Sequence, residues 1–197
     1  MRMGELSGCA AIENVMEDLS LHILDIGENS IHAGATHILI LIRESPVDDT
    51  LTIEIEDNGE GMTSEEMAKA SDPFYTTRTT RRVGLGLSLL DQAAKAANGT
   101  FEIESRPGSG TQISATFQLS HVDCKPIGNM ADTITALLAR RPDIDITYHH
   151  ERGGQGISFS TKEIRHQLDD VPVNSAVSLN FIRQYLAQEE DNLAHHV

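Results

Sequence analysis

The sequence of 197 residues contains no tryptophan and has only two cysteines, Cys9 and Cys124. Two cysteines this far apart argue against a disulfide framework and for the reducing environment of the cytoplasm. Long hydrophobic runs are also missing, since the run Ile38–Ile42 is far too short to cross a membrane. The N-terminal segment lacks a long apolar stretch, so we expect no secretion signal.

Basic residues are scarce. The chain has 15 Lys and Arg against 30 Asp and Glu, which gives a formal net charge of -15. A chain with this charge repels nucleic acids and anionic membranes unless it carries a local basic patch, so neither is expected as a partner. Hydrophobic residues make up 39% of the chain, which is typical of a soluble globular protein with a proper core.

Hydrophobic periodicity predicts an alternation of helices and strands in the first 120 residues. A helix is expected from residue 12 to 32, because apolar residues recur there at intervals of three and four. An irregular stretch from 72 to 83 contains three arginines and is predicted to be a long loop. The other expected elements are strands at 36–44 and 50–57, a short helix at 63–71, a helix ending at Asn98-Gly99, and a hairpin of strands at 100–106 and 111–119.

The tail, residues 121–197, is predicted to be a small α/β unit of about half the size of a domain. It contains a helix at 129–141, a hairpin at 144–161 with a Gly-Gly turn, and a helical remainder. Six histidines and Cys124 lie in it, but the paired histidines lack the spacing of metal ligands. We therefore expect a docking or sensing role, with Phe181, Ile182 and Tyr185 packing on the core or on a partner.

A polar stripe runs along the predicted first helix. His22, Asp25, Asn29 and His32 fall close together at about 100° per residue, beside the apolar face. Polar groups next to a core must find partners if they are buried. The stripe therefore indicates either a binding site or side chains that bond to neighbouring backbone and water.

Two glycine-rich motifs are compatible with ligand binding and also with plain turns. In the segment IEIEDNGEGM, a strand ends in Asp57, which is able to accept a hydrogen bond from an exocyclic amine, and Gly59 and Gly61 permit close approach to a flat ligand. In RRVGLGLSLL, Gly84 and Gly86 open a helix directly after a cluster of arginines, as anion sites at helix N-termini do. The alternatives are an Asp-Asn-Gly turn and a solvated loop.

Together, these motifs resemble the Bergerat-fold ATP-binding domain of histidine kinases, DNA gyrase, heat-shock chaperones and mismatch-repair ATPases. The resemblance covers about residues 14–119. The segment ENSIHAGAT is similar to the N box of the mismatch-repair ATPases, whereas DPFYTTR, VGLGLSLL and the hairpin around PGSG resemble a sensor histidine kinase. The resemblance implies an α+β fold, a two-layer sandwich with a mixed, mainly antiparallel sheet and helices on one face. The ATP-binding domain would span residues 12–119, with the extension at 121–197.

The resemblance also implies roles for individual residues, with ATP and Mg²⁺ as the ligands. Asn29 would coordinate the Mg²⁺ that bridges the phosphates, Asp25 would orient or deprotonate the attacking group, and His32 would lie near phosphate. Asp57 would bind the adenine amine, and Thr111 would join this contact. Further ATP contacts are implied for residues of the base pocket, the phosphate cradle and the lid at 74–82: Gly59, Gly61, Met62, Gly84, Leu85, Gly86, Leu87, Phe74, Thr76, Thr77, Arg78 and Arg82.

The sequence departs from the kinase pattern at three points. Arg82 replaces the first glycine of the usual Gly-x-Gly-Leu-Gly-Leu, and Asp25 is shorter than the common Glu. Too few residues precede the first helix for a phosphoacceptor hairpin, and His22 lacks the acid and proline of a phosphoacceptor motif. His22 is therefore interpreted as a structural or nucleotide-site histidine.

Three functions are compatible with these features. The favoured one is a kinase-like catalytic module that passes the γ-phosphoryl group of ATP to a partner protein, either to a histidine or to a serine or threonine. The second is a conformational switch driven by ATP with slow hydrolysis. The third is a regulatory module that binds nucleotide without chemistry. Whether the chain also forms a homodimer is left open by the sequence.

Overall fold

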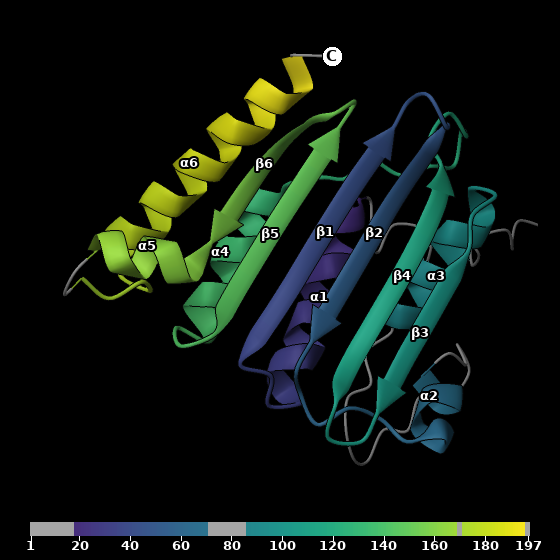
Figure 1. Ribbon diagram of the computed structural model, residues 1–197, viewed down its shortest axis with the longest axis horizontal. Coiled ribbons are helices and arrows are strands. Elements are labelled where there is room, and N and C mark those ends of the chain that lie inside the picture. The colour runs from purple at the N-terminus through teal and green to yellow at the C-terminus, as the bar shows by residue number, and fades with distance from the viewer. Residues whose placement is uncertain (1–17, 71–85, 169–170, 196–197) are drawn as a thin grey trace, which may run out of the picture.

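The computed structural model describes residues 18–70, 86–168 and 171–195. Six strands form one sheet in the order β3-β4-β2-β1-β5-β6, with the long helices against one face (Figure 1). Every pairing is antiparallel except that of β1 with β5, which is parallel. The strands are β1 (His37–Ser45), β2 (Thr50–Asp57), β3 (Phe101–Arg106), β4 (Gly110–Gln118), β5 (Asp145–Arg152) and β6 (Gln155–Ser160).

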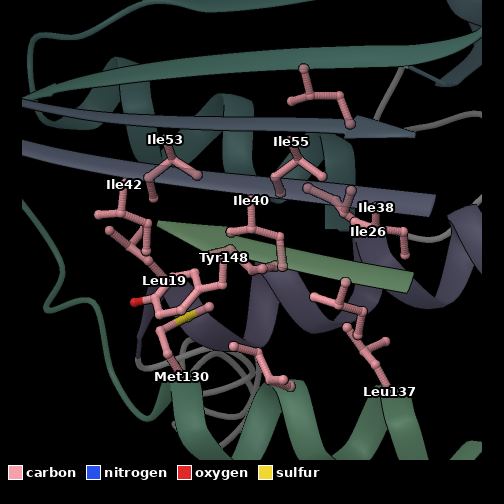
Figure 2. Close-up of a cluster of buried hydrophobic side chains, with 14 of the residues drawn as sticks. Leu19, Ile26, Ile38, Ile40, Ile42, Ile53, Ile55, Met130, Leu137 and Tyr148 are labelled. Carbon is pink, nitrogen blue, oxygen red and sulfur yellow. The ribbon is translucent and has the colours of Figure 1, made fainter. Parts of the chain in front are cut away.

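The alternation of side chains along the strands creates the core. Ile40 of β1 pairs with Ile55 of β2 and with Tyr148 of β5, and all three side chains are buried on the helix-covered face. Figure 2 shows such side chains converging from the strands and helices. The residues between them point to the open face, which is largely polar, as the half-buried Glu54 and exposed Glu56 of β2 illustrate. This pattern is expected when one side of a sheet contacts the core and the other contacts water.

The helices complete the layer behind the sheet. Helix α1 packs between α3 and α4, and α4 packs in turn against α6. Gly27 in the middle of α1 permits the close contact with α4, since a Cβ atom there would lie 2.8 Å from Leu137 Cδ1. The helices are α1 (Leu19–His32), α2 (Ser64–Ala70), α3 (Gly86–Ala96), α4 (Met130–Arg140), α5 (Thr161–Leu168) and α6 (Ala176–His195).

The observed fold confirms the predicted two-layer arrangement with a mixed, mainly antiparallel sheet. Strands β1 to β4 begin and end within one residue of their predicted bounds. The first helix was expected from residue 12, and its described part begins at Leu19, where Asp18 is the N-cap and accepts the Leu21 N–H. Residues 12–17 lie outside the described part of the chain.

The tail joins the same sheet. Strand β5 lies beside β1, and β6 extends the sheet beyond it, so the hairpin predicted at 144–161 is continuous with the first four strands. Ile182 is fully buried, whereas Phe181 is 50% exposed and Tyr185 is 39% exposed. Among the described residues, no helix has the length and apolar character needed to cross a membrane.

Candidate functional site

Asp57 ends β2 with its carboxylate buried on the helix side of the sheet. Its Oδ2 accepts a hydrogen bond of 2.7 Å from Ser30 Oγ, and its Oδ1 accepts one of 2.8 Å from the Gly59 N–H. The residue is only 8% exposed. Because a carboxylate oxygen has two lone pairs, each oxygen keeps acceptor capacity for a ligand N–H.

Small polar side chains surround Asp57 on the neighbouring strands. Thr111 of β4 lies directly opposite Asp57 in the sheet register. Its hydroxyl lies 2.9 Å from Ser105 Oγ on β3, and Ser105 Oγ accepts the Met62 N–H at 2.8 Å. Ser105 was not identified from the sequence. Its inward position, after the half-buried Phe101 and Ile103 of the same strand, was the available signal.

The glycines after Asp57 allow the loop to pack tightly. Gly61 has a φ of +66°, and a Cβ atom there would lie 2.1 Å from the Arg106 carbonyl oxygen. A Cβ atom at Gly59 would lie 2.9 Å from the Ala33 carbonyl oxygen. These close approaches require glycine on steric grounds. The predicted contribution of both glycines to a base pocket stays a prediction.

A second polar group lies where α1 faces the start of α3. Asp25 Oδ2 accepts hydrogen bonds from Asn29 Nδ2 at 3.3 Å and from the Gly86 N–H at 3.1 Å. Gly86 is the first residue of α3, and a Cβ atom there would lie 2.1 Å from Asp25 Oδ2. The carboxylate therefore interacts with the positive end of the α3 dipole.

The two polar groups are linked by adjacent residues of α1. Asn29 contacts Asp25 at the start of α3, and Ser30 contacts Asp57 at the end of β2. One short segment of helix thus contacts both the buried Asp57 carboxylate and the Asp25 carboxylate at the start of α3. Asn29 and Ser30 therefore have polar partners on both sides of the helix segment that carries them.

His32 lies at the exposed end of α1 and contacts α4. Its Nδ1 lies 2.7 Å from the Glu28 carbonyl oxygen, and its Nε2 lies 3.2 Å from Arg140 Nη2. A carbonyl oxygen only accepts, so Nδ1 carries the proton and Nε2 accepts from the guanidinium. Arg140 also pairs with the Glu28 carboxylate at 3.2 Å. In this arrangement His32 is held by Glu28 and Arg140, and its predicted contact with phosphate stays a prediction.

His22 lies one turn before Asp25 and is completely buried. Neither ring nitrogen makes a hydrogen bond of normal geometry to the described residues, although the Gly86 backbone lies close to the ring. The predicted polar stripe of α1 therefore has three parts. His22 is buried, Asp25 and Asn29 are half-buried and face the start of α3, and His32 is exposed at the end of α1.

The remaining predicted site residues fall into two groups. Leu87 is 5% exposed and its side chain belongs to the core, so any contact with phosphate would come from its backbone. The residues of the predicted lid and the first part of the phosphate cradle lie outside the described residues: Phe74, Thr76, Thr77, Arg78, Arg82, Gly84 and Leu85.

A metal ion at this site would have few protein ligands. The part of the chain that the structure describes contains no group of three His, Cys, Asp or Glu side chains able to hold a metal ion. Mg²⁺ commonly takes one or two protein oxygens and keeps several waters. The Asn29 amide oxygen and the Asp25 carboxylate are ligands of this kind, so the residues present fit Mg²⁺.

Comparison with known proteins identifies the family. Residues 12–121 match the model of the histidine kinase-, DNA gyrase B- and HSP90-like ATPases. The non-motile and phage-resistance protein of Caulobacter vibrioides is 30% identical over 112 residues, which cover 52% of this chain and 13% of that protein. The sensor protein kinase FleS of Pseudomonas aeruginosa is 34% identical over 105 residues, which cover 53% and 25%.

The anti-sigma F factor of Caldanaerobacter subterraneus is 36% identical over 88 residues, which cover 44% of this chain and 57% of that protein. The chain thus spans less than two thirds of the length of each of these relatives. The solved Aquifex aeolicus MutL ATPase domain complexed with ADP is 15% identical, with coverages of 74% of this chain and 64% of that one and a TM-score of 0.47. A likeness of that degree adds nothing to the assignment. Because the family model matches more than half of the residues, this chain belongs to the histidine kinase-, DNA gyrase B- and HSP90-like ATPases.

Proposed function

We propose that the site between β2, α1 and α3 binds ATP together with Mg²⁺. The observation that carries this proposal is the pair of contacts made by Asn29 and Ser30, which join an amine acceptor to a helix N-terminus. Adenine offers an exocyclic amine to Asp57, and the phosphates offer negative charge to the start of α3. Bound Mg²⁺ would neutralise phosphate charge, with the Asn29 amide supplying an oxygen ligand.

We further propose that the bound ATP donates its γ-phosphoryl group to a partner protein. Phosphoryl transfer requires mainly positioning and charge stabilisation, which a helix N-terminus and a small set of oxygen ligands supply. The names of two similar proteins, a sensor protein kinase and an anti-sigma F factor, support a role in signal transduction. We propose that the chain acts in the cytoplasm, which its two widely separated cysteines favour. Asp25 would orient or deprotonate the attacking group, since its Oδ2 accepts the Gly86 N–H at the start of α3.

Calorimetric titration with a non-hydrolysable ATP analogue, with and without Mg²⁺, tests the binding proposal. We expect binding that requires Mg²⁺ and that weakens by roughly 100-fold in Asp57→Asn, because a charged acceptor is replaced and an amide N–H faces the ligand amine. Glu54→Gln is the matched control, since it changes a carboxylate on the open face of the same strand. Tight binding by Asp57→Asn would refute the adenine assignment.

Asn29→Ala tests the metal end of the site. We expect this variant to lose most of the affinity gained from Mg²⁺, and Gln92→Ala, an exposed amide on α3, to keep it. Asp25→Ala should retain nucleotide binding and lose turnover, measured as the release or transfer of labelled γ-phosphate. Equal turnover in Asp25→Ala and the unmodified chain would remove Asp25 from the reaction.

A second candidate function is supported by the hydrogen bond between Asp25 and Gly86. Phosphate bound at the start of α3 would compete with Asp25 for the Gly86 N–H, so binding would rearrange this contact. Such a rearrangement suits a conformational switch that relaxes on slow hydrolysis. Hydrogen exchange of the first turn of α3, with and without the ATP analogue, tests it. Unchanged exchange in the presence of saturating analogue would exclude the switch.

A further inference from the structure

A cavity lies at the end of the sheet opposite Asp57. It has a volume of about 440 Å³ and is lined by the ends of β1 and β5, the start of β2, the C-terminal part of α6, and the segment 124–128 that leads into α4. The register of the sheet fixes the separation, because Glu44 beside the cavity pairs with Leu51, whereas Asp57 pairs with Ile38. In Figure 1 this end is where the arrowheads of β1 and β5 and the C-terminus lie.

A buried histidine organises the polar wall of this cavity. His150 Nδ1 lies 2.8 Å from Glu190 Oε2, and His150 Nε2 lies 3.1 Å from Glu44 Oε1. Ionised carboxylates only accept hydrogen bonds, so both ring nitrogens carry protons and the imidazole is positively charged. Tyr148 Oη donates to the other oxygen of Glu190. The carboxylates are thereby committed to groups of the protein itself.

The wall carries a positive balance of charge. Lys125, Arg152 and the imidazolium of His150 face the cavity together with Glu44 and Glu190, which leaves one excess positive charge in a chain of net charge -15. Arg152 Nη1 lies 3.9 Å from Glu44, beyond hydrogen-bond distance. Its Nε is buried and has no hydrogen-bond partner among the described residues. A ligand does not reach an atom that is shielded from solvent, but Arg152 lines the cavity and its side chain is 36% exposed, so part of this side chain is open to an anion.

The remaining wall is apolar. Leu51 and Leu193 are buried, and Leu119 is half-buried at the edge of the cavity. Pockets that combine one convergent charged group with such side chains suit small molecules with a charged head and an apolar body. The arginine fork matches the two oxygens of a carboxylate. We propose that this cavity binds a small aliphatic carboxylate, with its head on Arg152 and its chain against these leucines.

The position of the segment 124–128 suggests what such a ligand would regulate. The carbonyl oxygens of Pro126 and Ile127 accept the N–H groups of Leu19 and Ser20 at 3.0 and 2.7 Å, at the first turn of α1. The wall of the cavity is therefore also the N-terminal anchor of the helix that carries Asp25 and Asn29. Ligand binding would alter nucleotide affinity through this anchor, a consequence that rests on the proposed ATP site.

Calorimetric titration of the full chain with butanoate, pentanoate and hexanoate at constant ionic strength tests the site. We expect saturable binding of at least one of them, and binding at least about tenfold weaker for hexan-1-ol and hexylammonium, which lack the carboxylate. Arg152→Gln should weaken carboxylate binding about tenfold or more, whereas Arg43→Gln, on the open face of β1, should leave it unchanged. Thermal unfolding of each variant verifies that it is folded, and Arg152→Lys, which keeps the charge, should recover part of the affinity.

The outcomes separate the two proposals. Absence of binding by all three carboxylates, equal binding by Arg152→Gln, or a preference for hexylammonium would overturn the carboxylate site. A titration of the ATP analogue in the presence of the bound carboxylate should show a change of affinity of at least about twofold, and the reciprocal change must follow. If both ligands bind without affecting each other, the site stands and the coupling fails. If the carboxylate binds and the ATP analogue does not, the proposed function fails alone.

Discussion

Two histidines are buried in this molecule, and their neighbours give them different charges at neutral pH: His22 is neutral and His150 is positively charged. His22 lies on α1 behind the proposed ATP site, and burial together with the positive charge of Lys125 lowers its pKa to about 4. His150 lies on β5 beside the cavity at the end of the sheet opposite Asp57. Burial alone would lower its pKa as well, but the hydrogen bonds to Glu190 and Glu44 and the charges of both carboxylates outweigh burial and raise the pKa to about 9.

The difference teaches that hydrogen-bonded carboxylates reverse the effect that burial has on the charge of a histidine in this fold. The carboxylates at the two ends of the sheet also differ in their partners. At the far end the carboxylates are bonded to protein groups on neighbouring elements, which stabilises the docking of α6. At the end with Asp57, the carboxylates accept hydrogen bonds from nearby N–H and O–H groups and retain capacity for a ligand.

The largest expected effect comes from replacing His150, the positively charged histidine at the end of the sheet opposite Asp57. His150→Leu would leave Glu44 and Glu190 without their cation and should lower the free energy of unfolding by about 3–5 kcal/mol. His149→Leu is the matched control, because His149 is the adjacent residue on the open face of β5, and it should change stability by less than about 1 kcal/mol. Urea unfolding measures both. Equal losses in the two variants would remove the special role of His150.

The pH dependence of stability should have opposite signs for the two histidines. The pKa of His150 is raised in the folded chain, so its stabilisation is complete below about pH 6.5 and is lost as the pH rises towards about 9. Linkage converts this shift into a loss of about 3 kcal/mol across that window. Subtracting the urea unfolding curves of His150→Leu from those of the unmodified chain isolates the effect. A difference that does not vary with pH would contradict it.

His22 should act in the acidic range. Its pKa is lowered in the folded chain, so the fold keeps its full stability above about pH 6.5 and loses it as the pH falls towards about 4. The free energy of unfolding should fall by about 2 kcal/mol by about pH 5, because His22 becomes protonated in the unfolded chain while the buried ring stays neutral in the folded chain. The same subtraction with His22→Leu should reveal this acidic loss and no change on the alkaline side.

The sequence predicted the strands, the helices and the end with Asp57 because these depend on local patterns. Alternation of apolar residues located β1 and β2, and the motif after Asp57 indicated a candidate site, which stays a prediction. The cluster around His150 was not predicted, since Glu44 precedes His150 by 106 residues and Glu190 follows it by 40. No periodicity indicates that the hairpin of β5 and β6 pairs parallel to β1, and that pairing creates the cluster.

Dependence on contacts between distant elements also explains why Ser105 near Asp57 and the contact of His32 with Arg140 were not predicted. Ser105 contacts Thr111 only through the pairing of β3 with β4, although its inward position on β3 was readable. His32 was expected near phosphate from its position in the motif. Its contact with Arg140 depends on the packing of α4 against α1, which local sequence does not specify.

A smaller effect is expected from removing the Tyr148 hydroxyl, which donates a hydrogen bond to Glu190 beside His150. Tyr148→Phe removes the hydrogen bond to Glu190 and keeps the buried ring, so it should lower the free energy of unfolding by about 1.5–3 kcal/mol, the range for hydrogen bonds to charged groups. Tyr185→Phe is the control, since Tyr185 is partly exposed on α6 and forms no hydrogen bond to the described residues through its hydroxyl. Urea unfolding near neutral pH measures both, and equal losses would show that the Tyr148 hydroxyl contributes nothing.

The smallest effect is expected from removing the N-cap of α1. This variant tests whether the N-terminus of α1 contributes to nucleotide binding or only to stability. Asp18 caps α1 by accepting the Leu21 N–H, and Asn129 caps α4 by accepting the Asp132 N–H. Replacing either by Ala should cost about 1 kcal/mol of stability, because one helical N–H loses its partner. The two variants should differ in nucleotide affinity. Asp18→Ala loosens the helix that carries Asn29 and should weaken binding of the ATP analogue about twofold or more, whereas Asn129→Ala should leave it unchanged. Equal affinities in calorimetric titrations would separate the anchor from the site, and the N-terminus of α1 would then serve stability alone.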